Sequence, residues 1–219
     1  NLIFMSEQKI NFEIFRRFGP SILKVKIPEY VLNSLNNLID EILVDKDKQK
    51  KLDYGNKLVG DVTQEFQLDE EMVAKSGWLN FLSTCVYKWI ELENGSKITK
   101  FKLISTWVVR QFENEYNPTH WHGGHISGAG FLKLPTSFGD NKQKKTTNAY
   151  QGGNLQLIHG SKMFMCESVL NIKPEVGDFY FFPNYLMHAV FPFKDSKEER
   201  RSISFNASID ENIYNVYEQ

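Results

Sequence analysis

The chain has 219 residues with 26 basic and 27 acidic side chains, which gives a formal net charge of −1 at pH 7. This near-neutral balance provides no general attraction to nucleic acid or to an anionic membrane, because both attractions need a basic excess. Apolar residues make up 41% of the sequence, but none of their runs approaches the roughly 20 residues of a membrane span. We therefore expect a globular protein with a sizeable core and with neither nucleic acid nor membrane as a partner.

The first hundred residues predict helices around one strand. Residues 21–27 alternate like a half-buried strand, and Pro28 then suits a first helical turn. Apolar residues at helical spacing continue to Leu43, and the charged segment 45–51 is expected to end this helix in solvent. A second helix is expected to begin at Ser76 as its N-cap. Its apolar stripe is expected in the core: Trp78, Phe81, Leu82, Cys85, Val86, Trp89 and Ile90.

From about Lys97 the sequence changes to short β-rich runs separated by glycine, proline and asparagine. Strands are expected at 98–112, 126–134, 154–158, 162–166, 178–182, 188–193 and 202–208. Many short strands in succession favour a mostly β (α+β) fold, a jelly roll or closed barrel, with the N-terminal helices packed outside. We expect one domain over 1–219, with helical support at about 28–95 and the β core at about 97–208. The long polar connection 136–150 is expected to be a lid or a substrate-contact loop.

Cys85 and Cys166 match no metal or redox spacing, and we expect both to be reduced and buried. The N-terminal residues show no signal-peptide pattern. Both observations favour a cytoplasmic location, which would be the host cytoplasm for a viral protein.

Histidines are concentrated in one short stretch. Three of the five lie at His120, His122 and His125, and the others are His159 and His188. If residues 120–122 are in a strand, His120 and His122 face the same side, and His188 on another strand can supply a third imidazole. Three imidazoles suit a borderline divalent metal, so we favour a metal site over isolated hydrogen-bonded histidines.

A second set of candidates lies at residues 198–206. Strand alternation places Arg200, Ser202 and Ser204 on one face and Arg201 on the other. An inward arginine with a serine two positions on could bind a carboxylate, which suggests an anionic co-substrate. An ion pair of Arg200 with Glu198 or Glu199 at the surface is the equally weighted alternative.

These motifs together resemble the iron- and 2-oxoglutarate-dependent oxygenases, which are built on a double-stranded β-helix, and in particular such proteins of bacteria and phages. The resemblance covers roughly residues 107–208 and is carried by His120-Trp-His122, Ser127-Gly-Ala-Gly-Phe-Leu, Gly153-Asn-Leu, Gly177-Asp-Phe-Tyr-Phe-Phe-Pro183, His188 and Glu199-Arg-Arg-Ser-Ile-Ser-Phe-Asn206.

The resemblance implies a non-haem Fe(II) dioxygenase that couples oxidative decarboxylation of 2-oxoglutarate to hydroxylation of a substrate. It implies Fe(II) at His120, His122 and His188, and 2-oxoglutarate at Arg200 and Ser202. The residues expected near the substrate or behind the ligands are His125, Trp107 and Gln111. A peptide side chain or a small metabolite would be the substrate, and the sequence carries no signal for an oligomeric state.

One position departs from the family pattern. The common triad is His-x-Asp/Glu…His, whereas the carboxylate slot is occupied here by His122. An alternative makes His122 the first ligand and leaves Gly124 in the carboxylate slot, as in oxygenase-like halogenases. The competing interpretations are a cupin-type three-histidine metalloenzyme that does not use 2-oxoglutarate, and a non-catalytic β-barrel binding module. Of these, only the oxygenase gives the Arg200 and Ser202 pair a required role.

Overall fold

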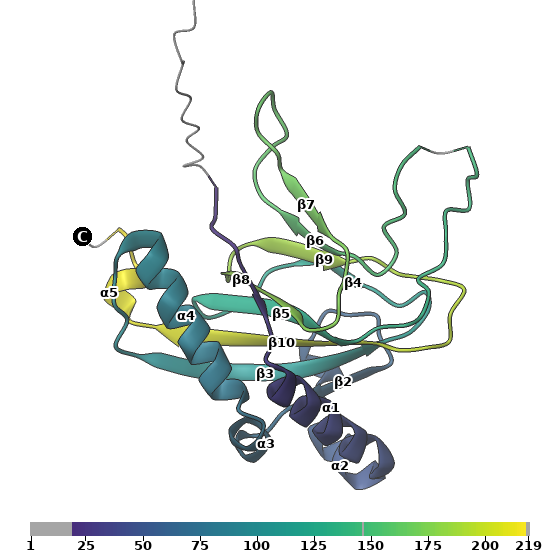
Figure 1. Cartoon of the computed structure of the whole chain (residues 1–219), viewed down its shortest axis with the longest axis horizontal. Coiled ribbons are helices and arrows are strands. Elements are labelled where there is room, and N and C mark those ends of the chain that lie inside the picture. Colours follow the sequence, from purple (N-terminus) through teal and green to yellow (C-terminus); the bar gives the residue numbers. More distant parts are fainter. Residues whose placement is uncertain (1–18, 146, 218–219) are drawn as a thin grey trace, which may run out of the picture.

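The computed structural model describes residues 19–145 and 147–217, whose strands form two antiparallel sheets (Figure 1). The larger sheet has the strand order β1 (Leu23–Lys26), β8 (Asp178–Pro183), β5 (Ile126–Lys133), β10 (Arg200–Ile209), β3 (Phe101–Gln111) and β2 (Gln64–Gln67). The smaller sheet has the order β4 (Asn117–His120), β9 (Met187–Val190), β6 (Leu155–Ile158) and β7 (Val169–Ile172). From β3 to β10 the chain passes repeatedly from one sheet to the other, and only β6 and β7, which pair with each other, follow in sequence within one sheet.

Most helices precede the β core. They are α1 (Glu29–Val44), α2 (Lys46–Leu52), the 3₁₀ turn η1 (Gly55–Lys57), α3 (Glu70–Lys75), α4 (Trp78–Asn94) and, after β10, α5 (Glu211–Tyr214). No described helix has the length and apolar character that a membrane crossing requires.

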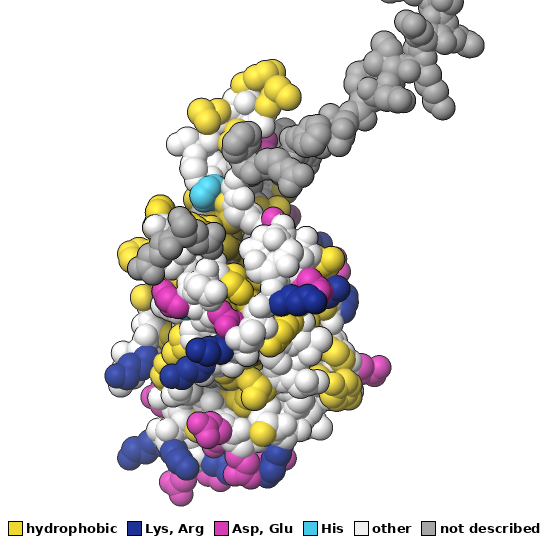
Figure 2. Space-filling model, turned by 90° about the vertical axis from the view of Figure 1, so that its left-hand side faces the viewer, with side chains coloured by type: hydrophobic (Ala, Val, Ile, Leu, Met, Phe, Trp, Pro, Cys, Tyr) yellow, Lys and Arg dark blue, Asp and Glu magenta, His cyan; other side chains and the backbone are white. Residues whose placement is uncertain are grey.

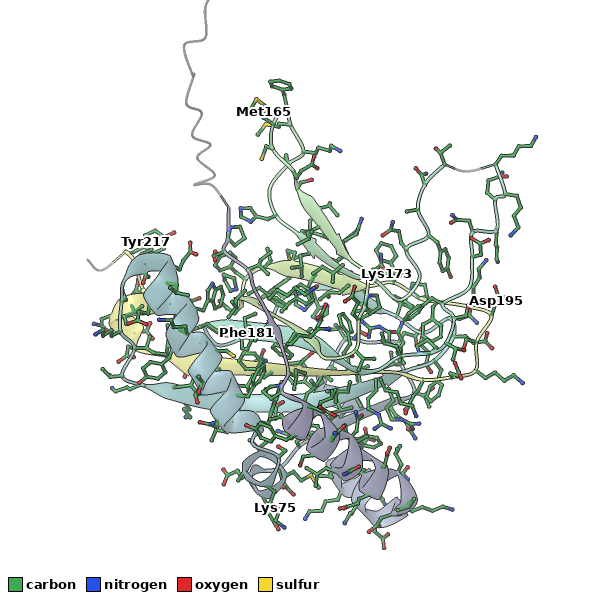
Figure 3. All side chains as sticks on the ribbon, in the orientation of Figure 1. Lys75, Met165, Lys173, Phe181, Asp195 and Tyr217 are labelled. Atoms are coloured by element: carbon green, nitrogen blue, oxygen red, sulfur yellow. The ribbon has the colours of Figure 1, made fainter. Side chains whose placement is uncertain are left out.

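Side chains of α1 and α4 share one buried cluster with the larger sheet. The Trp78 ring of α4 meets the Phe179 ring of β8 edge-on at 5.2 Å, and Phe179 lies 4.7 Å from Phe181, which Figure 3 labels. A second cluster joins both sheets and includes Phe131, Leu157 and Phe182. The larger sheet therefore has apolar contacts on both faces, with helices on one and the smaller sheet on the other.

An exposed apolar cluster lies away from this core. Met163, Phe164 and Met165, in the connection from β6 to β7, are 65%, 94% and 90% exposed. Hydrophobic side chains gather at the top of Figure 2 at the height where Figure 3 labels Met165, whereas many charged side chains lie at the opposite end.

Most elements agree with the sequence analysis. Strands occur in six of the seven expected β runs, and helices occur from Glu29 and from Trp78. The buried residues of α4 include every expected core position except Cys85, which is half-buried. The mostly β fold class is confirmed.

Several details of the prediction were wrong. Residues 162–166 form only an isolated Met163–Cys166 bridge, because the chain turns back there and pairs β7 with β6 instead. Cys166 is consequently exposed rather than buried, and it is free. The charged segment 45–51 does end α1 and is mostly exposed, but it also forms α2, which was not expected: the Asp45 side chain accepts hydrogen bonds from two backbone amides and caps this second helix.

Ser76 is not the N-cap of α4. It is the C-cap of α3, a helix that the sequence analysis missed, and Gly77 in a left-handed conformation (φ +75°) starts α4. The Ser76 hydroxyl donates to the Val73 carbonyl and so closes α3. A left-handed residue between two helices favours glycine, because other side chains are strained at this φ.

Candidate active site

A cavity of about 220 Å³ lies between the two sheets. The larger sheet contributes residues of β3 and β10, the smaller sheet contributes residues of β4, β6 and β9, and η1 with its flanking residues lies at one side. The charged residues in its lining are Lys57 and Arg200, with no aspartate or glutamate among them. The cavity therefore suits an anionic ligand.

Three histidines meet in this cavity. His120 ends β4 and pairs directly with His188 of β9, and their ring centroids are 4.2 Å apart. His122 lies beyond the end of β4, yet its Nε2 is 3.1 Å from that of His120. One ring nitrogen from each of the three lies within 4.8 Å of the others. The regular strand ends at His120, but residues 121 and 122 continue it without a turn or bend, so the two histidines lie on the same side as expected and Trp121 between them is exposed.

Each of these histidines has its Nδ1 bound to an acceptor. The His120 Nδ1 is 2.6 Å from the Pro118 carbonyl, and the His188 Nδ1 is 2.8 Å from the Leu186 carbonyl. The His122 Nδ1 contacts the Ser127 hydroxyl, which donates its own proton to the Phe205 carbonyl. Nδ1 must therefore carry the proton in each ring, which leaves the Nε2 lone pairs free.

Burial keeps the three rings neutral. Desolvation lowers the pKa of His122 to about 2, with further lowering by His188 and His120, and it lowers the pKa of His188 to about 4. Desolvation also lowers the pKa of His120. Neutral imidazoles with free Nε2 atoms are the form that binds a metal.

The donor set fits a small divalent metal. A divalent ion binds imidazole nitrogens at about 2.1 Å. If its bonds to two such nitrogens meet at a right angle, the two nitrogens are about 3 Å apart. The separation of the His120 and His122 Nε2 atoms is 3.1 Å. Two facing lone pairs repel at this distance, so a cation between the rings would relieve a repulsion that the fold imposes.

A hydrogen-bonded chain from the C-terminal helix fixes the backbone of His122. The Asn184 side chain donates to the His122 carbonyl at 3.2 Å, and the Asn184 carbonyl accepts the His122 amide at 3.0 Å. The Tyr214 hydroxyl of α5 in turn donates to Asn184 Oδ1 at 3.0 Å. Sequence reasoning found neither Asn184 nor Tyr214, because nothing in their local pattern marks a contact formed across 62 and 30 residues.

Arg200 is a buried cation without an anionic partner. Its side chain is 2% exposed, with the guanidinium 5.0 Å from the Phe131 ring centroid. Its Nε donates to the Gly153 carbonyl and its Nη1 to the Ser202 hydroxyl, but no described carboxylate pairs with it. Burial lowers the pKa of Arg200 to about 9, so it stays charged at neutral pH. The surface ion pair with Glu198 or Glu199 does not form.

Arg201 lies on the other face of β10. Its guanidinium pairs with Glu199 at 2.7 Å and with Asp40 of α1 at 2.6 Å, and it donates to the Asn36 side chain. Glu199 also pairs with Arg110 and Lys133. Arg201 therefore joins α1 to the sheet and has no part in the cavity.

The remaining candidates divide into those inside the cavity and those outside it. Trp107 lines the cavity and meets the His122 ring edge-on at 5.3 Å, and Ser202 lines it beside Arg200. Gln111 is buried outside the lining, where its amide donates to the Glu115 and Phe191 carbonyls. His125 also lies outside, stacked on Tyr214 at 3.9 Å, and His159 is exposed.

Gly124 offers no vacant ligand position. Its φ is +84°, and a Cβ there would lie 2.8 Å from the Ala207 carbonyl oxygen and 2.9 Å from Ile104. Gly124 is also outside the cavity lining. A vacant slot at this residue has no space open to the cavity.

The cavity opening carries residues that sequence reasoning did not single out. Tyr54, Lys57 and Val59 come from η1 and the residues around it, and they share the lining with Trp121, which is 64% exposed. The Tyr54 ring lies 6.2 Å from that of Trp107. Only Trp121 had a signal in the sequence, as the large residue between two histidines.

Residues 105–206 match a family model described as "Putative 2OG-Fe(II) oxygenase". The matched segment runs from β3 to β10 and contains the three histidines, Arg200 and Ser202. A search of curated proteins found no match to the sequence.

Solved structures of low sequence identity share the fold. A prolyl-4-hydroxylase of Pseudomonas putida aligns over 87% of this chain and 93% of its own, with 16% identity and a TM-score of 0.55. A prolyl hydroxylase of Trichoplax adhaerens, in complex with a peptide fragment of the hypoxia-inducible-factor oxygen degradation domain, aligns over 90% and 87%, with 16% identity and a TM-score of 0.53. The α-ketoglutarate-dependent epimerase SnoN of nogalamycin biosynthesis aligns over 86% and 77%, with 13% identity and a TM-score of 0.55.

Proposed function

Because the chain belongs to the 2OG-Fe(II) oxygenases, enzymes that use Fe(II) and 2-oxoglutarate, we propose that it hydroxylates its substrate at a three-histidine iron centre. The observation that carries this proposal is the convergence of three free Nε2 atoms beside a buried, unpaired arginine in one cavity. The repeated passage of the chain between the two sheets from β3 to β10 supports a double-stranded β-helix core.

His120, His122 and His188 would hold the iron through Nε2, each oriented by the acceptor bound to its Nδ1. When bound, iron supplies the oxidising chemistry, in which dioxygen and 2-oxoglutarate give succinate, carbon dioxide and one oxygen atom inserted into a substrate C–H bond. Three neutral ligands contribute no negative charge, so the dianionic co-substrate would offset two of the three positive charges of Fe(II) and Arg200.

Arg200 would bind the distal carboxylate of 2-oxoglutarate through its free guanidinium donors, with the Ser202 hydroxyl beside it. A buried cation without a partner costs several kcal/mol, and an anionic ligand would offset that cost. Phe131 and Gly153 hold the guanidinium plane, so little side-chain entropy remains to be lost on binding. A cupin-type enzyme without 2-oxoglutarate gives this arginine no role.

Binding under anaerobic conditions tests the assignment without any substrate. We expect the wild-type protein to bind Fe(II) and then 2-oxoglutarate, and His122→Ala to lose tight iron binding while His159→Ala keeps it. Full iron occupancy in His122→Ala would contradict the three-histidine centre. Iron binding with no effect of 2-oxoglutarate would favour the cupin-type alternative.

A further inference from the structure

One edge of the larger sheet is only partly covered. β10 pairs with β3 along its whole length, from Arg200 opposite Gln111 to Ile209 opposite Phe101. On the other side, β2 pairs only with residues 107–110 of β3. Figure 1 shows β2 beside one end of β3 alone. Among the described residues, no strand pairs with the outer edge of β3 at residues 101–105.

The chain leaves this edge for a local reason. The Leu68 amide still donates to the Thr106 carbonyl at 3.0 Å, which continues the β2 pairing by one residue. Asp69 then accepts the Met72 amide and caps α3, so the backbone turns away from the sheet. The uncovered part of β3 is thus in line with β2, where a further strand would continue it.

A groove follows this uncovered edge. It has a volume of about 780 Å³ and lies between the β3 edge, α3 and the first turn of α4, and Figure 3 labels Lys75 at the end of α3. Half of its lining is apolar, including Leu68, Val73, Ala74 and Leu79 opposite the strand, and the other half is polar or charged. Ile104 on β3 is 51% exposed there. The groove therefore combines an apolar wall with main-chain groups that have no strand partner.

The groove is continuous with the active site. Ser105 of β3 lines both the groove and the cavity that holds the three histidines. A chain lying along residues 101–105 would therefore end at a residue that lines the cavity. Five residues of extended chain span about 16 Å, which matches the uncovered segment.

We infer that the substrate is a polypeptide, which binds in extended conformation by adding a strand to the β3 edge and so places one side chain over the cavity. The inference rests on the proposed oxygenase function and specifies its substrate class. An unpaired strand edge recognises a second main chain, because its amide and carbonyl groups repeat at the spacing of a partner strand. A small metabolite has no matching row of groups.

A second copy of the chain fits this edge less well. α3 bounds the groove on the far side, so one extended segment can enter but a whole sheet cannot. The exposed Lys102 on this edge also disfavours sheet-to-sheet association. A short peptide segment needs only a few regular pairs.

The probe for this inference is a set of pooled synthetic 12-residue peptides of random sequence, added with 2-oxoglutarate to the Fe(II)-loaded full chain. Succinate formation above the peptide-free rate is the readout, and single amino acids as N-acetyl amides form the small-molecule arm. We expect peptides to stimulate at concentrations at least tenfold lower than any N-acetyl amide. When single backbone amides of an active peptide are N-methylated in turn, only every second position should abolish the stimulation. The reason is that every second amide of an added strand faces β3.

A steric variant tests the location. Ala74→Arg fills the groove from the exposed face of α3 and should raise the half-maximal peptide concentration at least tenfold. Asn80→Arg, on the exposed face of α4 outside the groove, is the matched control and should behave as wild type. In wild type, an active peptide should slow amide hydrogen exchange at residues 101–105 at least tenfold.

The remaining outcomes separate this inference from the proposed function. Three outcomes would overturn strand addition and leave the proposed oxygenase function intact. They are succinate formation that only small molecules stimulate, an equal effect of N-methylation at every peptide position, and an equal response of Ala74→Arg and Asn80→Arg to the peptide. A dimer in wild type that Ala74→Arg dissociates would assign the edge to self-association instead. Absence of both succinate formation and 2-oxoglutarate binding would remove the proposed function itself.

Discussion

Arg200 and Arg201 are neighbours on β10 and both are almost fully buried, yet their surroundings differ in charge. Arg201 faces α1, where Asp40 and Glu199 balance it. Arg200 faces the cavity between the sheets, where neutral groups alone contact it. A balanced buried cation can stabilise the fold, whereas an unbalanced one destabilises it until an anion arrives. The comparison indicates that one face of β10 is built for stability and the other for a ligand.

The largest expected effect is on co-substrate binding. Arg200→Met replaces the cation by an apolar side chain of similar length, so 2-oxoglutarate would lose its charge-assisted partner in a dry site. We expect a loss of about 3 kcal/mol, more than a hundredfold in Kd, with the free energy of unfolding unchanged or increased. Calorimetric titration of 2-oxoglutarate and urea denaturation measure the two quantities. Loss of stability without loss of affinity would reverse the roles of the two faces.

The matched change on the other face should act on stability. Arg201→Met removes two ion pairs and the hydrogen bond to Asn36, but Glu199 keeps Arg110 and Lys133. We expect the free energy of unfolding to fall by about 2 kcal/mol with the Kd of 2-oxoglutarate unchanged. Strand alternation places Arg201 away from the cavity, and the structure adds the partners that a buried arginine on the core face would lose.

The two arginines also show how far the sequence leads. Strand alternation was sufficient to separate Arg200 from Arg201, and helical periodicity was sufficient to place Trp78 and Phe81 in the core. The spacing of two was also sufficient to bring His120 and His122 together, although the end of the four-residue strand at His120 is not marked in the sequence. Asn184, Tyr214 and the groove beside β3 could not be predicted, since they depend on contacts between distant segments.

Glu65 is a buried acidic side chain without a basic partner among the described residues, so it can be compared with the buried cation Arg200. Burial, with Asp53 and Glu115 nearby, raises the pKa of Glu65 to about 7, so this group can neutralise where Arg200 cannot. A raised native pKa means that stability present below pH 4.5 is lost as the pH rises through 7. We therefore expect the difference in free energy of unfolding between Glu65→Gln and wild type to shift in favour of the variant by about 1.5 kcal/mol when the pH is raised from 5 to 8.

Denaturation at both pH values measures this difference. The exposed neighbour Asp61, changed to Asn, is the control and should show no such dependence. An equal gain at pH 5 and pH 8 would mean that Glu65 does not titrate in this range.

The smallest expected effect concerns the support of His122. Tyr214→Phe removes one hydroxyl that donates to Asn184 and keeps the ring stacked on His125. We expect metal affinity to fall severalfold, about 1 kcal/mol, because Asn184 loses one anchor but keeps both bonds to His122. Mn(II) titration followed by electron paramagnetic resonance measures it, and Tyr217→Phe, on an exposed side chain, is the control.

A larger loss in Asn184→Ala than in Tyr214→Phe would follow from the same chain of bonds. If Asn184→Ala bound Mn(II) as wild type does, the histidine cluster would be held by its Nδ1 acceptors alone.

The most direct test of the three-histidine oxygenase centre is the stoichiometry of 2-oxoglutarate turnover in air with added Fe(II), measured for wild type, His188→Ala and His159→Ala. Wild type and His159→Ala should form one succinate for each 2-oxoglutarate consumed, and His188→Ala should form none, because His188 is buried in the cluster whereas His159 is exposed outside it. Iron-dependent succinate formation that persists in His188→Ala would contradict the assignment.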